Sequence, residues 1–404
     1  MQFTTIQFKN SRGENLAARL DLPVGEQARA FVLFAHCFTC SKNLSAVANI
    51  SRALNRQGIA VLRFDFTGLG ESEGTFADTN FSSNVADLIS AAEFLETEFQ
   101  APDVLVGHSL GGAAVLQAAG NIASVRAVAT IGAPAEPSHV RHLLVNSQAQ
   151  IKAEGQAQIK LAGRTFTIKK QFLEDLEQTR MQATIAALKK PLLVLHSPVD
   201  NTVGIDNAGV IFQAARHPKS FVSLDHADHL LTDERDSRYA GSVIAAWAGR
   251  YLGEPKPPKR DPGDNQILVR TGRQGYQTEI DANGHSLIAD EPGSAGGTNS
   301  GPTPYDLLVS ALGTCTSMTL RMYADHKGWP LEGIEVRLQH EKVHARDCET
   351  CETQTGKIDR IVREIVLHGP LDQAQKERLL EIADRCPVHR TLQAEIRVAT
   401  RLAG

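Results

Sequence analysis

Short apolar runs alternate with helical patterns between residues 29 and 252. The runs consist mainly of Val, Leu, Ile, Phe and Ala, and the clearest are 29–36, 59–66, 103–109, 125–133, 191–198 and 220–227. Strands without polar alternation are covered on both faces, which is typical of a parallel sheet flanked by helices. We therefore predict an α/β domain with a doubly wound, mostly parallel sheet.

The pattern changes at two places. Residues 135–187 are more polar, and 156–170 alternate like a β-hairpin, so we interpret this stretch as an insertion over the carboxyl edge of the sheet. The segment 254–264, EPKPPKRDPGD, concentrates proline, glycine and charged residues that cannot form a core. We predict a first domain over 1–253, a linker over 254–264 and a second domain over 265–404.

The second domain follows a different plan. One long helical pattern over 304–327 is apolar on most sides, so we predict that it lies at the centre of the domain. Strands and helices around it make the domain α+β. The predicted strands are 267–272, 276–282, 285–291, 334–343, 359–369 and 394–402, and the predicted further helices are 372–385 and a short one after 386–390.

Composition narrows the classes of function. The 404 residues carry a formal net charge of -4, and no basic stripe marks a nucleic-acid-binding surface. No apolar run approaches the roughly 20 residues of a membrane helix, and the first residues lack a secretory signal layout. Six cysteines in a chain of this length make no secreted disulfide framework. We predict a soluble, cytoplasmic protein with no nucleic-acid or membrane partner.

The strongest chemical signal is Gly-His-Ser-Leu-Gly at 107–111, between a predicted buried strand and a helix of small residues. This sequence in that position predicts a nucleophile elbow, a strained turn that exposes the hydroxyl of Ser109 at the start of the helix. Serine needs a base to remove its proton and an acid to orient that base. Asp200 and His229 each follow a later predicted strand, in the chain order that this arrangement requires.

Two assignments within this site need a choice. His226 and His229 share one loop, and we predict His229 as the base because it stands directly before an apolar pair. We interpret His108 as a packing residue of the elbow. The backbone N–H groups of Phe38, in the loop after the strand 29–36, and of Leu110 are predicted to hold the oxyanion.

Residues 1–252 thereby resemble the α/β-hydrolase family, and His36-Cys37-Phe38 resembles its His-Gly-X oxyanion loop, with a cysteine where glycine is usual. The resemblance implies a serine hydrolase of small-molecule acyl esters or thioesters that needs no cofactor. Ser109 would be the nucleophile, His229 the base and then the acid, and Asp200 the group that orients the histidine.

Two Cys-x-x-Cys pairs have more than one interpretation. Cys37 and Cys40, at the predicted oxyanion loop, either line the acyl pocket as small side chains, which we favour, or form a redox pair. Cys348 and Cys351 lie in a polar stretch between two predicted strands. That stretch is a plain loop, an exposed redox pair or a labile metal clip completed by nearby histidines.

The remaining cysteines lie at the long helix and at a helix start. Cys315 is inside 304–327, and Cys386 precedes Pro387, whose φ suits a first helical turn that stabilises a thiolate. Residues 266–402 resemble the OsmC and organic hydroperoxide resistance family on these positions. The resemblance implies that Cys315 attacks an organic hydroperoxide, that Cys386 resolves the sulfenic acid as a disulfide, and that a dithiol reductant restores both thiols. It also implies a homodimer through this domain.

A departure from the family supports a second hypothesis. Tyr305 stands ten residues before Cys315, where the family carries a glutamate that activates the thiol, and the stretch 285–294 has no arginine at the matching place. The alternative is a non-peroxidatic module for dimerisation and ligand binding that gives the hydrolase its oligomeric frame.

Overall fold

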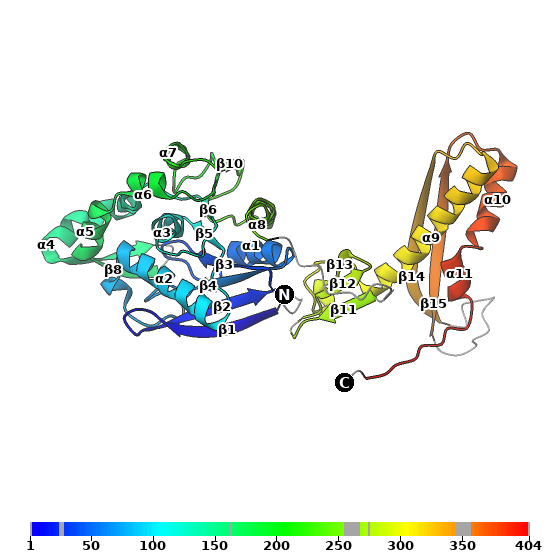
Figure 1. The fold of residues 1–404 in the computed structure, drawn as a ribbon, viewed down its shortest axis with the longest axis horizontal. Coiled ribbons are helices and arrows are strands. Elements are labelled where there is room, and N and C mark those ends of the chain that lie inside the picture. Colours follow the sequence, from blue (N-terminus) through cyan, green and yellow to red (C-terminus); the bar gives the residue numbers. More distant parts are fainter. Residues whose placement is uncertain are drawn as a thin grey trace. The chain divides into compact units, whose positions relative to one another are not determined.

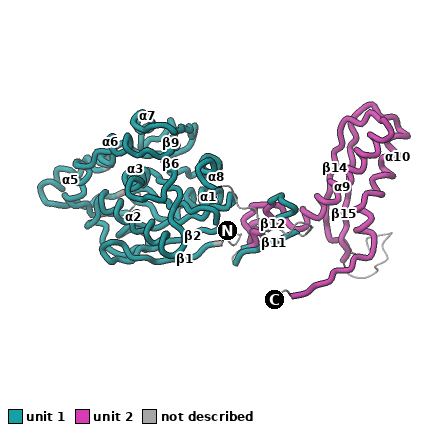
Figure 2. The backbone as a smooth tube through the Cα atoms, viewed as in Figure 1, with its two compact units in different colours: residues 1–275, 281–286 teal, residues 276–280, 287–404 magenta. Residues whose placement is uncertain are grey.

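The computed structural model describes residues 2–23, 28–161, 164–253, 267–273, 275–344 and 357–402. They form two compact units, one of residues 1–275 with 281–286 and one of residues 276–280 with 287–404 (Figure 2). The predicted linker, 254–264, lies outside the described residues.

Eight strands form the framework of the first unit (Figure 1): β1 (Gln2–Lys9), β2 (Asn15–Leu22), β3 (Ala30–Ala35), β4 (Ile59–Phe64), β5 (Val104–His108), β6 (Ala127–Ile131), β9 (Leu192–His196) and β10 (Lys219–Ser223). They pair in the order β1-β2-β4-β3-β5-β6-β9-β10. The pairs β1–β2 and β2–β4 are antiparallel, and all later pairs are parallel. The predicted mostly parallel sheet is confirmed.

Helices cover both faces of this sheet, which is why its central strands are apolar without alternation. In β3, Phe31, Leu33 and Ala35 face one core, and the residues between them face the other. The first core includes α2 (Phe81–Glu98), α3 (Leu110–Ala118) and α7 (Asp206–Ala214). The second includes α1 (Ser45–Asn55) and α8 (Glu234–Gly249).

The predicted insertion lies between β6 and β9. It contains an antiparallel hairpin, as its alternating pattern predicts. The hairpin packs on the turn η1 (Phe76–Asp78), where the rings of Phe76 and Phe166 lie 4.9 Å apart. The elements are η2 (Pro137–Ser147), α4 (Gln148–Glu154), β7 (Gln156–Leu161), β8 (Arg164–Lys169), α5 (Lys170–Gln178) and α6 (Met181–Ala187).

Past residue 266 the described chain forms a three-stranded sheet, β11-β12-β13, and a two-stranded antiparallel sheet, β14-β15, with helices packed beside it. The elements are β11 (Ile267–Thr271), β12 (Thr278–Ala282), β13 (His285–Ala289), η3 (Gly293–Ala295), α9 (Pro304–Lys327), β14 (Gly333–His344), β15 (Lys357–His368), α10 (Gln373–Ala383) and α11 (Pro387–Leu392).

Helix α9 has well-defined ends. Thr303 and Asp306 form a reciprocal capping box at its start, and Gly328 ends it in the left-handed conformation. One face packs on β14 and α10 (Figure 1). The opposite face is open in the single chain, because the side chains of Met318 and Met322 are 62% and 72% exposed.

The strand predicted over 394–402 is wrong, because the described residues there have no regular structure. Strands β14 and β15 pair only with each other in the described chain, and residues 394–402 join neither outer edge, so the segment lacks the partner strand that would hold it extended. Ile396 and Val398 are exposed as a result.

Among the residues that the structure describes, no helix combines the length and apolar character needed to cross a bilayer.

Candidate active site

Ser109 occupies a sharp turn between β5 and α3. Its φ of 55° and ψ of -127° are unusual for a residue with a side chain. Neighbouring glycines allow the close packing that this turn requires, because a Cβ on Gly107 would lie 2.3 Å from the carbonyl oxygen of Gly111. A Cβ on Gly111 would lie 2.4 Å from that of Ala35. The turn therefore has the geometry of the predicted nucleophile elbow.

The structure brings together Ser109, His229 and Asp200 in one chain of hydrogen bonds. The Ser109 hydroxyl lies 2.9 Å from Nε2 of His229, and Nδ1 of His229 lies 2.7 Å from Oδ2 of Asp200. Asp200 follows β9, and His229 lies in the loop after β10. The competing candidate, His226, is exposed. The geometry thus selects His229 over His226.

Backbone groups keep the Asp200 carboxylate ionised. Its Oδ1 accepts hydrogen bonds of 2.8 Å from the N–H groups of Thr202 and Val203. Burial by itself raises the pKa of Asp200, but these bonds and the one from His229 outweigh it and hold the pKa below its ordinary value. The carboxylate can therefore orient His229 and stabilise a positive charge on it.

His108 plays a structural part. Burial lowers its pKa to about 3, so the ring is neutral and its Nε2–H donates to the carbonyl oxygen of His229 at 2.6 Å. That bond holds the backbone of His229 in place. His108, which we predicted as a packing residue, therefore also positions the backbone of His229.

The loop after β3 supplies the predicted oxyanion group. In the described structure neither the N–H of Phe38 nor that of Leu110 makes a hydrogen bond, so both are free to donate. A Cβ on Gly111 would also lie 2.5 Å from the carbonyl oxygen of His36, which shows how closely the elbow packs on this loop. Cys37 is not among the residues with a positive φ, so its side chain introduces no backbone strain.

Cys37 and Cys40 form a disulfide. The favoured interpretation, small side chains that line the acyl pocket, did not include a bond between the two sulfurs, whereas the Cys-x-x-Cys spacing allows one. The reason for the bond is local geometry, because the loop folds back so that the Cys40 N–H donates to the carbonyl oxygen of Cys37 at 3.2 Å.

Two residues of this site escaped the sequence analysis. Gly132, with φ 53°, ends β6 where a Cβ would lie 3.2 Å from Oδ2 of Asp200 and 3.4 Å from Nδ1 of His229. His196 donates from Nε2 to the carbonyl oxygen of Val203 at 2.7 Å, which supports the loop that bonds Asp200. A glycine directly after the apolar run 125–131 is the signal that points to Gly132.

Among the described residues of the second unit, Cys315 and Cys386 are free thiols. Cys315 is half-buried on α9, and Cys386 is fully buried as the residue that caps α11. The Cys386 sulfur accepts from the N–H of His389 at 3.3 Å and lies 3.6 Å from Oγ1 of Thr316. No disulfide or hydrogen bond joins the two sulfurs in the described structure.

An arginine that the sequence analysis missed contacts Thr316, whose hydroxyl lies next to the Cys386 sulfur. Arg363 on β15 donates to Oγ1 of Thr316 at 2.9 Å and to the carboxylate of Asp384 at 2.7 Å. Along β15 it replaces an apolar residue on the face of Ile361 and Ile365, where the partners on β14 are also apolar or half-buried. That interruption of a period-two pattern is the signal that could have found it.

In the described part of the chain, no group of three His, Cys, Asp or Glu side chains could hold a metal ion. Cys348 and Cys351 lie outside the described residues.

Comparisons with known proteins identify the families of both parts of the chain. The model of the alpha/beta hydrolase family matches residues 32–293, and that of the OsmC-like proteins matches residues 297–401. The chain thus carries an alpha/beta hydrolase domain followed by an OsmC-like domain.

Individual relatives match the first domain. The crystal structure of the esterase domain of a Rhodothermus marinus protein is 55% identical, with a TM-score of 0.53, over 63% of this chain and 100% of that one. The mitochondrial palmitoyl-protein thioesterase ABHD10 of Rattus norvegicus is 24% identical over 51% of this chain and 70% of its own length. Est1E of Butyrivibrio proteoclasticus with ferulic acid, 18% identical, shares the fold over 61% of this chain and 98% of its own, with a TM-score of 0.51.

Buried His108 makes the free energy of unfolding of the first unit depend on pH. Because the folded pKa of His108 lies far below the unfolded value of about 6.5, the unfolded state binds the proton first as the pH falls. Between about pH 6.5 and 3, His108 should cost up to about 1.4 kcal/mol of unfolding free energy per pH unit. We expect His108→Gln to reduce this slope in denaturant unfolding at pH 7, 6 and 5.

The exposed His226 provides a matched control, since His226→Gln should leave the slope as it is in the unaltered protein. Burial also lowers the pKa of His36 and His196, so part of the slope should remain in His108→Gln. A slope in His108→Gln equal to that of the unaltered protein would contradict the assignment.

Proposed function

Because the chain belongs to the alpha/beta hydrolase family, we propose that its first unit is a serine esterase or thioesterase in which Ser109, His229 and Asp200 form the catalytic triad. One observation carries the proposal: the hydrogen-bonded chain of these three residues, with Ser109 in the strained turn. The substrate is a small-molecule acyl ester or thioester.

In the proposed reaction, His229 moves a proton from Ser109 to the leaving group. His229 accepts the proton of Ser109 as the oxygen attacks the acyl carbon, and Asp200 stabilises the imidazolium that forms. The N–H groups of Phe38 and Leu110 donate to the oxyanion. His229 then returns the proton to the leaving alcohol or thiol, and water releases the acyl group by the same steps.

Two relatives support this chemistry. A 55% identical domain is described as an esterase, and a 24% identical protein as a thioesterase. The residue types and geometry of the site suit both ester and thioester bonds, because each reaction develops the same tetrahedral oxyanion.

Substitution of the triad should abolish turnover. We expect Ser109→Ala to lower kcat on a p-nitrophenyl ester by at least about 10⁴-fold and to prevent labelling by a fluorophosphonate probe. Asp200→Asn should lower kcat by about 10⁴-fold with the fold intact. His226→Gln is the matched control for His229→Gln and should retain activity. Labelling that persists in Ser109→Ala would show that another residue is the nucleophile.

For the second unit we propose a cysteine-based hydroperoxide reductase. The thiolate of Cys315 attacks the terminal oxygen of an organic hydroperoxide, which yields a sulfenic acid and an alcohol. Cys386 condenses with the sulfenic acid to form a disulfide and water, and a dithiol reductant restores both thiols while it becomes a disulfide itself. The cytoplasm, which we propose as the location, supplies such reductants.

The hydrogen bonds of Thr316 and the burial of the two thiols support the different roles of Cys315 and Cys386. Thr316 has one hydroxyl proton, which it donates to the carbonyl oxygen of Leu312 at 2.8 Å, and it accepts from Arg363. Toward Cys386 it can therefore only accept, so in a hydrogen bond between the two groups the thiol is the donor. Cys386 is fully buried and Cys315 only half-buried, so the more accessible Cys315 suits the attack and Cys386 the second step.

A pair of variants tests these roles. We expect Cys315→Ser to reduce consumption of an organic hydroperoxide, with dithiothreitol as reductant, to the background rate. Cys386→Ser should instead accumulate the sulfenic acid at Cys315, which a dimedone probe detects by mass spectrometry. Equal background rates for the unaltered protein and Cys315→Ser would contradict the reductase and favour the alternative of a non-peroxidatic dimerisation and ligand-binding module.

We also propose that the second unit mediates a homodimer. The open face of α9 supports this, since Met318 and Met322 would otherwise remain in water. Val362 and Val366 are further exposed apolar residues of this unit, on β15.

A charge on that face should separate the protomers. We expect Met322→Glu to change the sedimentation coefficient from that of a dimer to that of a monomer, because a carboxylate would have to be buried without a partner. The matched control is Tyr239→Glu, at an exposed residue of the first unit, which should remain dimeric. A dimer that persists in Met322→Glu would place the interface elsewhere.

A further inference from the structure

We propose that the Cys37–Cys40 disulfide is a reversible redox site that positions the oxyanion loop of the hydrolase, so that its reduction by a dithiol lowers turnover. The proposal rests on the hydrolase function proposed above. It starts from the place of the disulfide, which closes a small ring around Phe38 and Thr39, and Phe38 carries one of the two oxyanion donors.

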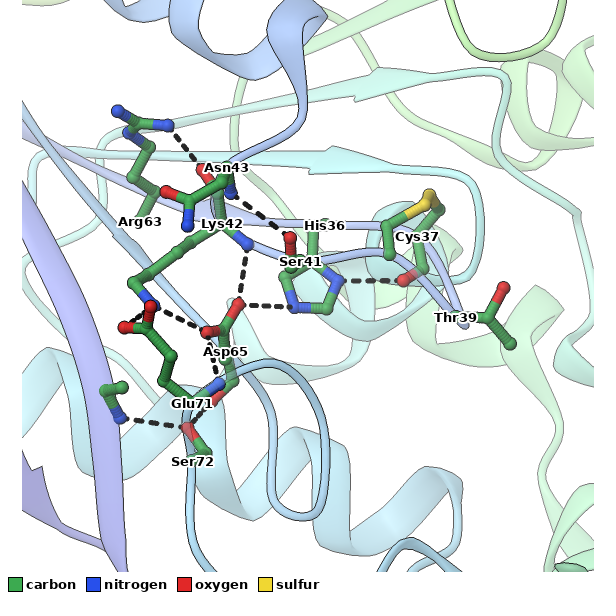
Figure 3. Close-up of polar contacts among 12 residues, drawn as sticks. His36, Cys37, Thr39, Ser41, Lys42, Asn43, Arg63, Asp65, Glu71 and Ser72 are labelled. Carbon is green, nitrogen blue, oxygen red and sulfur yellow. Dashed lines mark hydrogen bonds and ion pairs between the residues drawn. A yellow bond between two sulfur atoms is a disulfide. The ribbon is translucent and has the colours of Figure 1, made fainter. Parts of the chain in front are cut away.

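Both ends of the oxyanion loop, residues 36–42, are anchored independently of the disulfide (Figure 3). At one end, Nδ1 of His36 donates to the carbonyl oxygen of Cys37 at 2.8 Å. At the other end, the backbone N–H of Lys42 donates to Asp65 at 2.6 Å, and its Nζ lies 2.7 Å from both Asp65 and Glu71. Lys42 and Asp65 are buried, so solvent does not weaken this pair.

The middle of the loop has fewer anchors. The ring of Phe38 packs against those of Phe76 and Phe172, with centroids 5.6 and 5.3 Å away, and Arg164 donates to the carbonyl oxygen of Thr39. Without the disulfide, the single backbone bond from Cys40 to Cys37 is what closes the turn. The disulfide is therefore the covalent element that sets the direction of the Phe38 N–H.

The size of the effect follows from these anchors. Removal of one oxyanion donor from a serine hydrolase costs about 10²- to 10³-fold in kcat. The aromatic contacts and the anchored ends remain after reduction, so the donor is misdirected rather than lost. We expect kcat to fall about three- to tenfold, with little change in KM, because the oxyanion contact forms only in the transition state.

The accessible sulfur is that of Cys40, which is half-buried, whereas Cys37 is buried. A thiolate of the dithiol attacks the Cys40 sulfur, the disulfide bond breaks, and Cys37 leaves as a thiolate that takes up a proton. The second thiol of the reductant then attacks the mixed disulfide. The products are two protein thiols and the cyclic disulfide of the reductant, and reoxidation by a disulfide reverses both steps.

The test compares the full chain in oxidised and reduced dithiothreitol, with p-nitrophenyl acetate as substrate and the state of each cysteine read by alkylation and mass spectrometry. The expected result is a three- to tenfold lower kcat once Cys37 and Cys40 are alkylated, with recovery on reoxidation. Cys40→Ser should have the low kcat under both conditions. The double variant Cys315→Ser, Cys386→Ser is the matched control and should respond like the unaltered chain.

Other results overturn the proposal. If kcat is equal in both states although both thiols have formed, the disulfide does not position the oxyanion loop, and the proposed hydrolase function is unaffected. If the disulfide is reduced only after the protein unfolds, it is not a reversible site of the folded protein. If kcat of Cys40→Ser still falls in reduced dithiothreitol, the response comes from other thiols. The unaltered chain alone decides the first two outcomes if Cys40→Ser does not fold. Absent hydrolysis and absent fluorophosphonate labelling in both states would instead reject the hydrolase, and this inference with it.

Discussion

The close approach of α3 to the sheet is the constraint on which the first unit depends. A Cβ on Gly107, Gly111 or Gly112 would lie 2.3 to 2.5 Å from atoms of α3, β3 or the residue after Gly132, so the three positions admit no side chain. This approach forces Ser109 to a φ of 55° and turns its hydroxyl out of the sheet. It also places the N–H of Leu110 beside the loop that carries Phe38. The strained turn at Ser109 and its packing against the strand before the Phe38 loop thus follow from one packing requirement.

Burial and hydrogen bonding then assign the charges around Ser109. Burial alone would neutralise every group here, and it does so for His108, whose pKa falls to about 3. Asp200 remains ionised because two backbone N–H groups and His229 donate to it. The carboxyl edge of a parallel sheet brings these loops together, since the strands β3, β5, β6, β9 and β10 end on the same side.

In the second unit, the guanidinium of Arg363 is the charged group that lies beside the buried hydroxyl of Thr316. Arg363 stands between Ile361 and Ile365 on one face of β15 and donates to Thr316, which contacts the Cys386 sulfur. The hydroxyl therefore links a charged group to a thiol through one atom. Cys315, the thiol proposed to attack, directly precedes Thr316 on α9, so the contacts of Thr316 with Cys386 and Arg363 lie one residue away from it in the chain.

By itself the sequence determined the parallel sheet, the elbow at Ser109 and the chain order of Asp200 and His229, because continuous apolar runs and a Gly-x-Ser-x-Gly turn are local signals. It did not determine that Cys37 and Cys40 are bonded, nor that Arg363 reaches Thr316. Those contacts depend on how a loop folds back and which strands face α9. It also predicted a strand over 394–402, which pairs with none of the described strands. Local sequence patterns specify helices, strands and turns. Which side chains and strands contact one another depends on how residues far apart in the chain pack together, and only the tertiary structure decides this.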